Sequence, residues 1–153
     1  RGFHGKRTRT TGSSGAGSPL MYMLDTDICI YIIKGKPAGV SKRFQRLQPG
    51  DLAMSVITFA ELMNGAMKSR RIEENVAKLN EMAELLEIPA FDRRAAAVYG
   101  AVRSNLEKRG EVIGSYDLLI AAHAISLDLV LVTNNEREFR RVKGLKMENW
   151  AKS

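Results

Sequence analysis

The stretch Leu129-Val130-Leu131-Val132 decides the fold, and the polar residues Thr133-Asn134-Asn135 follow it directly. Four consecutive apolar residues that include two valines are typical of a strand buried on both faces. Such strands occupy the centre of parallel sheets, because helices cover both faces of those sheets. We therefore predict a parallel sheet in which this stretch is a central strand.

Strand and helix patterns alternate along the rest of the chain. Short apolar runs at 21–24 and 52–54 predict two more strands, and the segment near 145–148 predicts an edge strand. Helical patterns lie between the strands at 28–34, 40–47, 57–66, 72–86, 92–109 and 118–125. Ser55, Asp92 and Ser115 are expected N-caps. This alternation predicts an α/β/α sandwich around a central, mainly parallel sheet.

The first twenty residues differ in composition from the rest. They contain four basic residues, no acidic residue and a Gly/Ser run, so we expect residues 1–20 to be a vector-derived leader. The formal net charge is 24 − 17 = +7 for the whole chain and 20 − 17 = +3 without the leader. The basic charge is therefore only a weak indication of nucleic-acid binding. Residues 21–153 are expected to form one domain.

Composition excludes several classes of protein. No apolar run approaches the roughly 20 residues that a membrane span requires. Cys29 is the one cysteine, which excludes an intramolecular disulfide and fits the reducing cytoplasm. Beyond the leader the one histidine is His123, so a zinc site of cysteine and histidine ligands is excluded. We expect Cys29 and His123 to be packed in the core, and any chemistry to use carboxylates.

Polar residues follow two of the predicted strands, where ligands bind in open α/β sheets. Asp25 and Asp27 follow the first strand, and Thr133-Asn134-Asn135 follows the central strand. Glu61 lies within an apolar helix, and Asp117 opens a helix that is apolar nearly all round. A charge among core residues needs a partner, and converging carboxylates are typical of a magnesium or manganese site.

Each of these residues also has a simpler interpretation. Asp25 and Asp117 can be helix caps or first-turn charges, and Glu61 can be a partly exposed helix residue. The basic run after the central strand can be a solvated face or can hold a phosphate backbone; its members are Arg137, Arg140, Arg141, Lys143 and Lys146.

Four motifs in this order carry a family resemblance. They are Met23-Leu-Asp25-Thr-Asp27, Thr58-Phe-Ala-Glu61-Leu-Met-Asn-Gly65, Ile113-Gly-Ser-Tyr-Asp117-Leu-Leu-Ile-Ala-Ala-His-Ala124 and Val132-Thr-Asn-Asn135-Glu-Arg-Glu-Phe139. Together they resemble the VapC-type PIN-domain ribonuclease toxins of bacterial toxin–antitoxin operons, over essentially all of residues 21–150. The last motif is similar to that of the subgroup that cleaves initiator tRNA in its anticodon loop.

The resemblance implies a catalytic magnesium site, with Mn²⁺ as a possible substitute. Carried over by position, its ligands are Asp25, Glu61 and Asp117. The chain departs from the family at Asp27, where asparagine is usual, and at Asn135, where many members have a fourth aspartate. Asn135, Glu138 and Asp27 are therefore the candidates for a fourth ligand. Thr26, Thr133 and Asn135 are expected to orient waters or carboxylates around the ion.

The resemblance also implies partners. These are a cognate VapB-like antitoxin that places an arginine among the carboxylates, a tRNA substrate, and a second copy of the chain in a homodimer contacting through residues 57–86. Two alternatives stay open. Asp25-Thr-Asp27 also resembles the motif of haloacid-dehalogenase-type phosphohydrolases, with Asp25 as nucleophile and Asp27 as general acid. Asn135 leaves room for a catalytically weak module that binds RNA or an antitoxin.

Overall fold

Four short parallel strands form the centre of the molecule. The computed structural model describes residues 21–152, and the expected leader at 1–20 lies outside them. The strands are β1 (Tyr22–Leu24), β2 (Leu52–Met54), β3 (Val130–Val132) and β4 (Met147–Glu148). Their order in the sheet is β2-β1-β3-β4, and all three pairings are parallel. The prediction of a parallel sheet with the 129–132 stretch inside it is confirmed.

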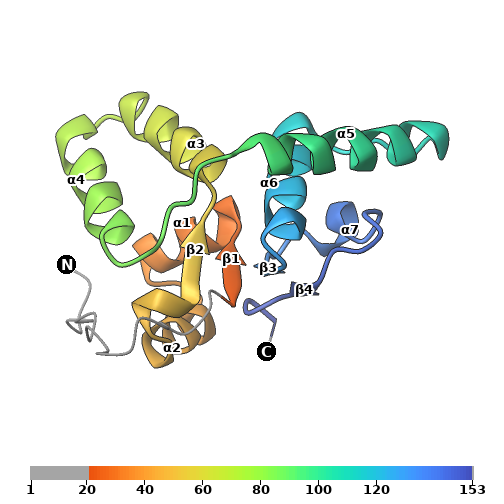
Figure 1. The fold of residues 1–153 in the computed structure, drawn as a ribbon. Helices are drawn as coiled ribbons and strands as arrows, with labels where there is room; N and C mark the ends of the chain where they lie inside the picture. Colours follow the sequence, from red (N-terminus) through yellow and green to blue (C-terminus); the bar gives the residue numbers. More distant parts are fainter. Residues whose placement is uncertain (1–20, 153) are drawn as a thin grey trace, which may run out of the picture.

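Helices surround this sheet on both faces (Figure 1). The helices are α1 (Thr26–Lys34), α2 (Ala38–Arg46), α3 (Val56–Met67), α4 (Ile72–Ala83), α5 (Arg93–Lys108), α6 (Ser115–Ser126) and α7 (Glu136–Phe139), with a short 3₁₀ helix at Pro49–Asp51. In Figure 1, α3 and α4 form one projecting arm, and α5 projects on the other side of the sheet. The predicted α/β/α sandwich is confirmed.

Alternate residues of each strand supply two separate cores. Met23 and Leu131 are paired across β1 and β3 and pack with α5 and α6. Leu24 and Val132, one residue further along, pack on the opposite face with α1 and α2. Because side chains of a strand alternate between faces, this pattern requires apolar residues at consecutive positions. That requirement explains the continuous apolar runs in the sequence.

Capping explains where several helices begin. The Ser55 hydroxyl accepts a hydrogen bond from the Ile57 N–H, and an Asp92 carboxylate oxygen accepts one from the Ala95 N–H. Both predicted N-caps are therefore confirmed. The prediction for Ser115 is wrong, because α6 begins at Ser115 itself and its N-cap is Gly114, which has no side chain to cap with.

Other differences from the predicted elements are local. The fourth helix ends at Ala83 rather than at 86, and Glu87 then forms a single parallel bridge with Ala53 of β2. The short helix α7 lies within the charged run that follows β3, where no helix was predicted. Gly35 ends α1 at a φ of +73°, where residues other than glycine are strained. None of the described helices is both long enough and apolar enough to cross a membrane.

Candidate active site

Asp25 lies at the end of β1, where it caps α1 and is almost completely buried. One of its carboxylate oxygens accepts the Thr26 N–H at 2.8 Å, and the other accepts the Thr133 hydroxyl at 2.7 Å. Burial, followed by repulsion from Asp27, raises the pKa of Asp25 to about 7. A simple cap near a helix N-terminus would be stabilised as an anion. Asp25 is therefore a cap whose charged form is disfavoured, because no cation among the main causes of its pKa shift compensates for burial and for Asp27.

Thr133 joins the end of β3 to this carboxylate. Its hydroxyl donates to Asp25 and accepts the Asn135 N–H at 2.9 Å, so the direction of its proton is fixed. The backbone of Asn135 thus helps to orient Thr133. The Asn135 residue is also the N-cap position of α7, although its side chain makes no capping hydrogen bond.

Asp27 lies in the first turn of α1, two residues after Asp25. Its two oxygens accept the backbone N–H groups of Ile28 at 2.7 Å and Asn134 at 3.0 Å. Burial raises the pKa of Asp27, and these N–H donors oppose the increase. The carboxylate that replaces the usual asparagine therefore ties α1 to the segment after β3.

Glu61 reaches the site from α3, through a hydroxyl of α1. The Thr26 hydroxyl lies 2.9 Å from Glu61 Oε1 and 3.2 Å from the hydroxyl of Thr58. A carboxylate can only accept, so Thr26 donates to Glu61 and accepts from Thr58. Thr58 is fully buried, one helical turn before Glu61 on the same helix. The two threonines therefore fix the position of the Glu61 carboxylate.

Asp117 completes the set from the first turn of α6. Burial is the main cause that raises its pKa to about 6, and repulsion from Glu61, Glu138 and Asp27 adds to the shift. Repulsion from Asp117 in turn raises the pKa of Asp25. The structure therefore brings the carboxylates of β1, α3, α6 and α7 into one electrostatic field, as the sequence predicted for the first three.

The side chains do not form a ready-made cage for a bare ion. Within residues 21–152, no group of three or more His, Cys, Asp and Glu side chains could hold a metal ion by itself. The donor chemistry nevertheless fits a hydrated cation such as magnesium, which prefers carboxylate oxygens and keeps several of its waters. Over the same residues, no lysine or arginine is among the main causes of the pKa shifts of Asp25 and Asp117. A divalent cation would supply the positive charge that the described side chains do not.

Three polar residues around the site were given no role of their own from the sequence. Thr58 positions Thr26, Asn134 donates to Asp27 and also to the Tyr31 hydroxyl at 3.0 Å, and Asn149 donates to Asn134 at 3.0 Å. Thr58 carries a detectable signal, because it precedes Glu61 by one helical turn. Asn149 has none, since only the fold brings the C-terminal segment next to α1.

His123 and Cys29 belong to the core, as predicted. His123 Nε2 lies 3.2 Å from the Ala90 carbonyl, and Nδ1 lies 2.8 Å from the Ser55 hydroxyl. The carbonyl can only accept, so the neutral ring carries its proton on Nε2 and accepts from Ser55 at Nδ1. Burial lowers the pKa of His123, which favours this neutral form. The Cys29 thiol is buried against the Leu24 carbonyl.

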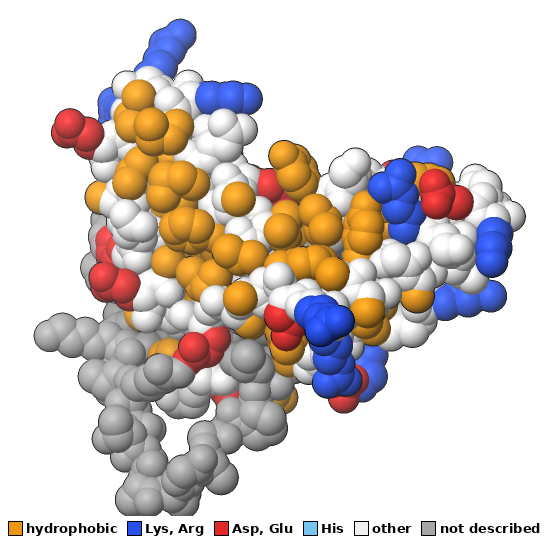
Figure 2. All heavy atoms as spheres, turned by 45° about the horizontal axis from the view of Figure 1, so that its top comes forward, with side chains coloured by type: hydrophobic (Ala, Val, Ile, Leu, Met, Phe, Trp, Pro, Cys, Tyr) orange, Lys and Arg blue, Asp and Glu red, His pale blue; other side chains and the backbone are white. Residues whose placement is uncertain are grey.

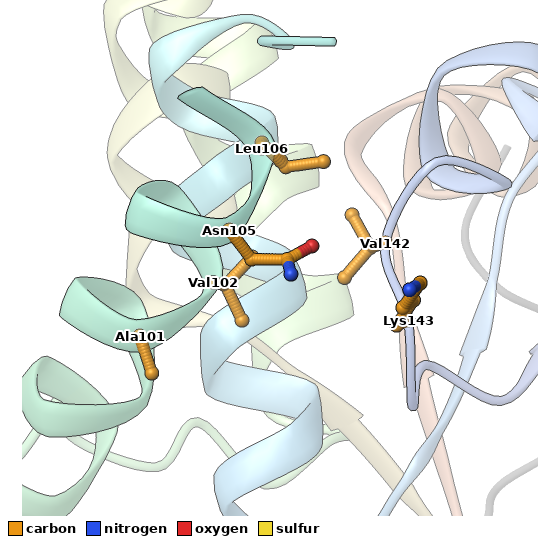
Figure 3. A pocket seen from close by; sticks show the side chains of 6 residues that line it. All are labelled: Ala101, Val102, Asn105, Leu106, Val142 and Lys143. Atoms are coloured by element: carbon orange, nitrogen blue, oxygen red, sulfur yellow. The ribbon is translucent and has the colours of Figure 1, made fainter. Parts of the chain in front are cut away.

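A separate cavity lies away from these carboxylates. It has a volume of about 200 Å³ and lies between α5 and the segment after α7 (Figure 3). Its lining residues are Ala101, Val102, Asn105, Leu106, Val142 and Lys143. None of the candidate acidic residues lines this cavity, and its walls are mainly apolar, so it is not the site of a carboxylate-based reaction.

The fold and the site define a parallel α/β domain whose carboxylates, from the end of β1, from α3 and from α6, suit a divalent cation. Comparison with known proteins gives its family. The chain matches the PIN domain over residues 22–145. It therefore belongs to the PIN-domain family, whose nucleases generally depend on a divalent metal.

Within that family the chain belongs to the VapC ribonucleases, the toxins of toxin–antitoxin pairs. It is 43% identical over 132 residues to the tRNA(fMet)-specific endonuclease VapC of Shigella flexneri, covering 86% of this chain and 99% of that protein. It is 42% identical over 134 residues to ribonuclease VapC2 of Rickettsia felis, covering 87% and 100%. The DNA-bound VapBC structure from Salmonella typhimurium superposes with a TM-score of 0.82 at 43% identity, covering 86% and 98%. These likenesses exclude the phosphohydrolase alternative.

Proposed function

We propose that this ribonuclease uses Mg²⁺ to cleave initiator tRNA in the anticodon loop and so blocks translation. The observation that carries the proposal is that Asp117 is repelled by Glu61 and in turn repels Asp25, so that carboxylates from three separate segments act on one another. No lysine or arginine of the described residues is among the main causes of the pKa shifts of Asp25 and Asp117. The choice of RNA is supported by the relative from Shigella flexneri, which is named a tRNA(fMet)-specific endonuclease. Mn²⁺ is expected to substitute for Mg²⁺, because it accepts the same oxygen ligands.

The roles of the side chains follow from their contacts. Asp25, Glu61 and Asp117 would hold the cation directly or through water. A bound Mg²⁺ lowers the pKa of a coordinated water and stabilises negative charge on phosphoryl oxygens. Thr133 and Thr26 keep the Asp25 and Glu61 carboxylates oriented. One of the three carboxylates would accept the proton of the attacking water.

Total tRNA is the substrate that tests this proposal. The antitoxin-free protein should generate one new pair of ends in the anticodon loop of initiator tRNA when Mg²⁺ or Mn²⁺ is present, and none with chelator. Cleavage that is equally fast in chelator would contradict metal dependence. Intact tRNA under all conditions would favour the catalytically weak binding module.

We also propose a VapB-like antitoxin as the partner. The solved relatives from Salmonella typhimurium, Rickettsia felis and Haemophilus influenzae are described as VapBC complexes. An arginine from such a partner would satisfy the crowded carboxylates, because a guanidinium forms paired, charge-assisted hydrogen bonds with them. It would thereby occupy the place of the cation. The pair would act in the cytoplasm, where tRNA is found.

Growth arrest is the cellular prediction of this proposal. Expressing residues 21–153 alone should stop bacterial growth through loss of protein synthesis, and co-expression of the neighbouring small operon gene should restore growth. Incorporation of a labelled amino acid measures the effect. Normal growth despite confirmed expression of folded protein would refute the toxin assignment in this chain.

The fourth ligand has its own test. Glu138 raises the pKa of Asp117 by repulsion, whereas Asn135 contributes a backbone N–H to Thr133. We expect Glu138→Gln to weaken activation by Mg²⁺ at least about tenfold, the size of the effect that residues supporting a metal site usually have. Asn135→Ala should be milder because it keeps the backbone N–H. A larger loss in Asn135→Ala would reverse the assignment.

A homodimer through α3 and α4 is the remaining proposal about partners. Val56, Met67 and Ile72 of these two helices are exposed by 36% or more. Figure 2 shows hydrophobic side chains gathered over the arm of α3 and α4 and continuing toward α5. An apolar face of this extent is typical of a protein interface.

A further inference from the structure

A second basic surface of the molecule lies on α1 and α2, outside the basic run that follows β3. It consists of Lys34, Lys36, Lys42, Arg43 and Arg46, and all five side chains are exposed. No acidic residue occurs between Asp27 and Asp51, so the segment that carries them has a formal charge of +5. We call these five residues the α1–α2 basic patch.

Few acidic side chains neutralise this patch. Among residues 21–152, only Arg43 of the five has an acidic partner within 4 Å, namely Glu148 at 3.1 Å. The run after β3 likewise has one such pair, between Lys146 and Asp128 at 3.0 Å. Glu136 and Glu138 lie within that run, however, so residues 134–146 have a formal charge of 5 − 2 = +3, compared with +5 for residues 28–50.

Helix capping explains only part of this charge. Lys34, Arg43 and Arg46 lie in the last turns of α1 and α2, where positive charge interacts favourably with the helix dipole. Lys36 lies between the helices, and Lys42 lies one turn before Arg46, where two like charges repel. Within residues 21–152, these two residues have no ion pair or capping role that would account for them.

The patch is physically connected to the candidate active site. Asp27, Tyr31 and Lys34 are spaced i, i+4 and i+7 on α1, so they share one stripe of the helix. Lys34 therefore lies about 10 Å from Asp27 along the helix axis. Asn134 donates hydrogen bonds to both Asp27 and Tyr31, so this stripe is held rigidly to the segment after β3.

Arg43 holds α2 against the C-terminal segment. Its guanidinium lies 5.1 Å from the centre of the Trp150 ring and pairs with Glu148 at the end of β4. Trp150 in turn packs edge-on against Tyr22 of β1. Lys42 and Arg46 of α2 therefore stay in a constant position relative to Lys34 and to the sheet.

We propose that the α1–α2 basic patch binds the phosphate backbone of the RNA next to the cleaved bond and so sets the direction in which the strand crosses the site. The proposal rests on the ribonuclease function proposed above. An RNA strand is the occupant that the observations favour, because the exposed charge of +5 is complementary to a polyanion and α1 joins Lys34 to Asp27 of the candidate site. An acidic segment of the antitoxin is the competing occupant.

Salt dependence of tRNA binding gives the sharpest test. The parent for this experiment is the full chain with Asp117→Asn, which is expected to bind labelled tRNA without cutting it. The patch variant adds four substitutions to this parent, namely Lys34→Gln, Lys36→Gln, Lys42→Gln and Arg46→Gln. Arg43 is kept because it holds α2 in place. Removing one interaction between a cation and a phosphate lowers the slope of log affinity against log salt by about 0.7 to 0.9. We therefore expect the slope to fall by about 3 and the affinity to fall at least about tenfold.

A matched control changes the net charge equally at the far ends of the two arms. Lys68→Gln, Arg70→Gln and Arg71→Gln lie at the turn between α3 and α4, and Lys108→Gln ends α5. This set should leave the slope within about 1 of the parent. Equal losses in both sets would overturn the proposal, because net charge alone would then explain binding. So would unchanged tRNA binding combined with impaired antitoxin binding, which would assign the patch to the antitoxin.

The two proposals fail in different ways. If the chain with Asp117 intact cleaves tRNA and the patch variant has the same affinity and slope, only the proposed RNA path is wrong. If the chain neither cleaves nor binds tRNA, the ribonuclease function is wrong and the RNA path with it.

Discussion

Asp117→Asn is expected to reduce tRNA cleavage by about two orders of magnitude or more while leaving the metal-free protein as stable as the parent or more stable. A metal site supplies several kcal/mol to the transition state, and each 1.36 kcal/mol is about a factor of ten in rate. The substitution removes a charge and preserves the shape of the side chain. Burial and three neighbouring carboxylates already disfavour the Asp117 anion, as its raised pKa of about 6 indicates.

The gain in stability should be modest because Asp117 is only half-buried. The shift in its pKa from 3.8 to about 6 would correspond to about 3 kcal/mol without screening, and solvent reduces this to about 1 kcal/mol. Thermal melts at pH 8 measure the gain, with and without Mg²⁺. The ion should stabilise the parent, because it binds only the folded state, and should stabilise the variant much less. A variant that is less stable yet still cleaves tRNA would show that Asp117 is merely a first-turn charge.

The second large effect concerns pH. The metal-free protein should become less stable as pH rises from 5 to 8, because the pKa of Asp25 is raised to about 7 in the folded state. The unfolded chain has the ordinary value near 3.8, so the folded state binds this proton more tightly. The resulting stability is fully present below about pH 4 and is lost as pH rises through about 7. A shift of about three pK units corresponds to an effect on the order of 4 kcal/mol in total, of which about two-thirds falls between pH 5 and 8.

Urea unfolding at pH 5, 6, 7 and 8 with chelator measures this loss. Asp25→Asn is the matched control, since asparagine keeps the shape and an oxygen for Thr133 but does not titrate. Its stability should vary less with pH than that of the parent over this range. If the free energy of unfolding varied with pH in the same way for both proteins, ionisation of Asp25 would not destabilise the folded state. The repulsion between the carboxylates would then leave no destabilisation for a bound cation to remove.

The sheet could be predicted from the sequence because a strand that is buried on both faces requires consecutive apolar residues. The consecutive apolar residues of β1, β2 and β3 are required by two separate cores, so short runs were sufficient to locate all three strands. The start of α6 was mispredicted because serine is a strong N-cap in general, whereas the turn at Gly114 places Ser115 inside the helix. The end of α4 was missed because its apolar spacing continues for one turn beyond the hydrogen-bonded helix.

The residues of the candidate site could be predicted where a charged side chain occurs at a position expected to be apolar. Glu61 among apolar residues and Asp117 at the start of a buried helix both indicated a partner, and the structure places them within each other's field. The roles of Thr58 and Asn149 were not predictable in the same way, because neutral polar residues are common in loops and helices. The α1–α2 basic patch is hard to detect in the sequence because its five cations are spread over two helices, whereas the later basic run is nearly continuous.

The central claim is that carboxylates from three segments form one cation site, and titration with Mn²⁺ tests it most directly. Paramagnetic resonance counts the free ions as Mn²⁺ is added to the chelator-treated parent and to Asp25→Asn, Glu61→Gln and Asp117→Asn, with Asp51→Asn as a control outside the site. We predict one site in the parent and the control that Mg²⁺ competes for, and affinity at least about tenfold weaker in each of the three variants. Equal affinity in the parent and all three variants would contradict the claim.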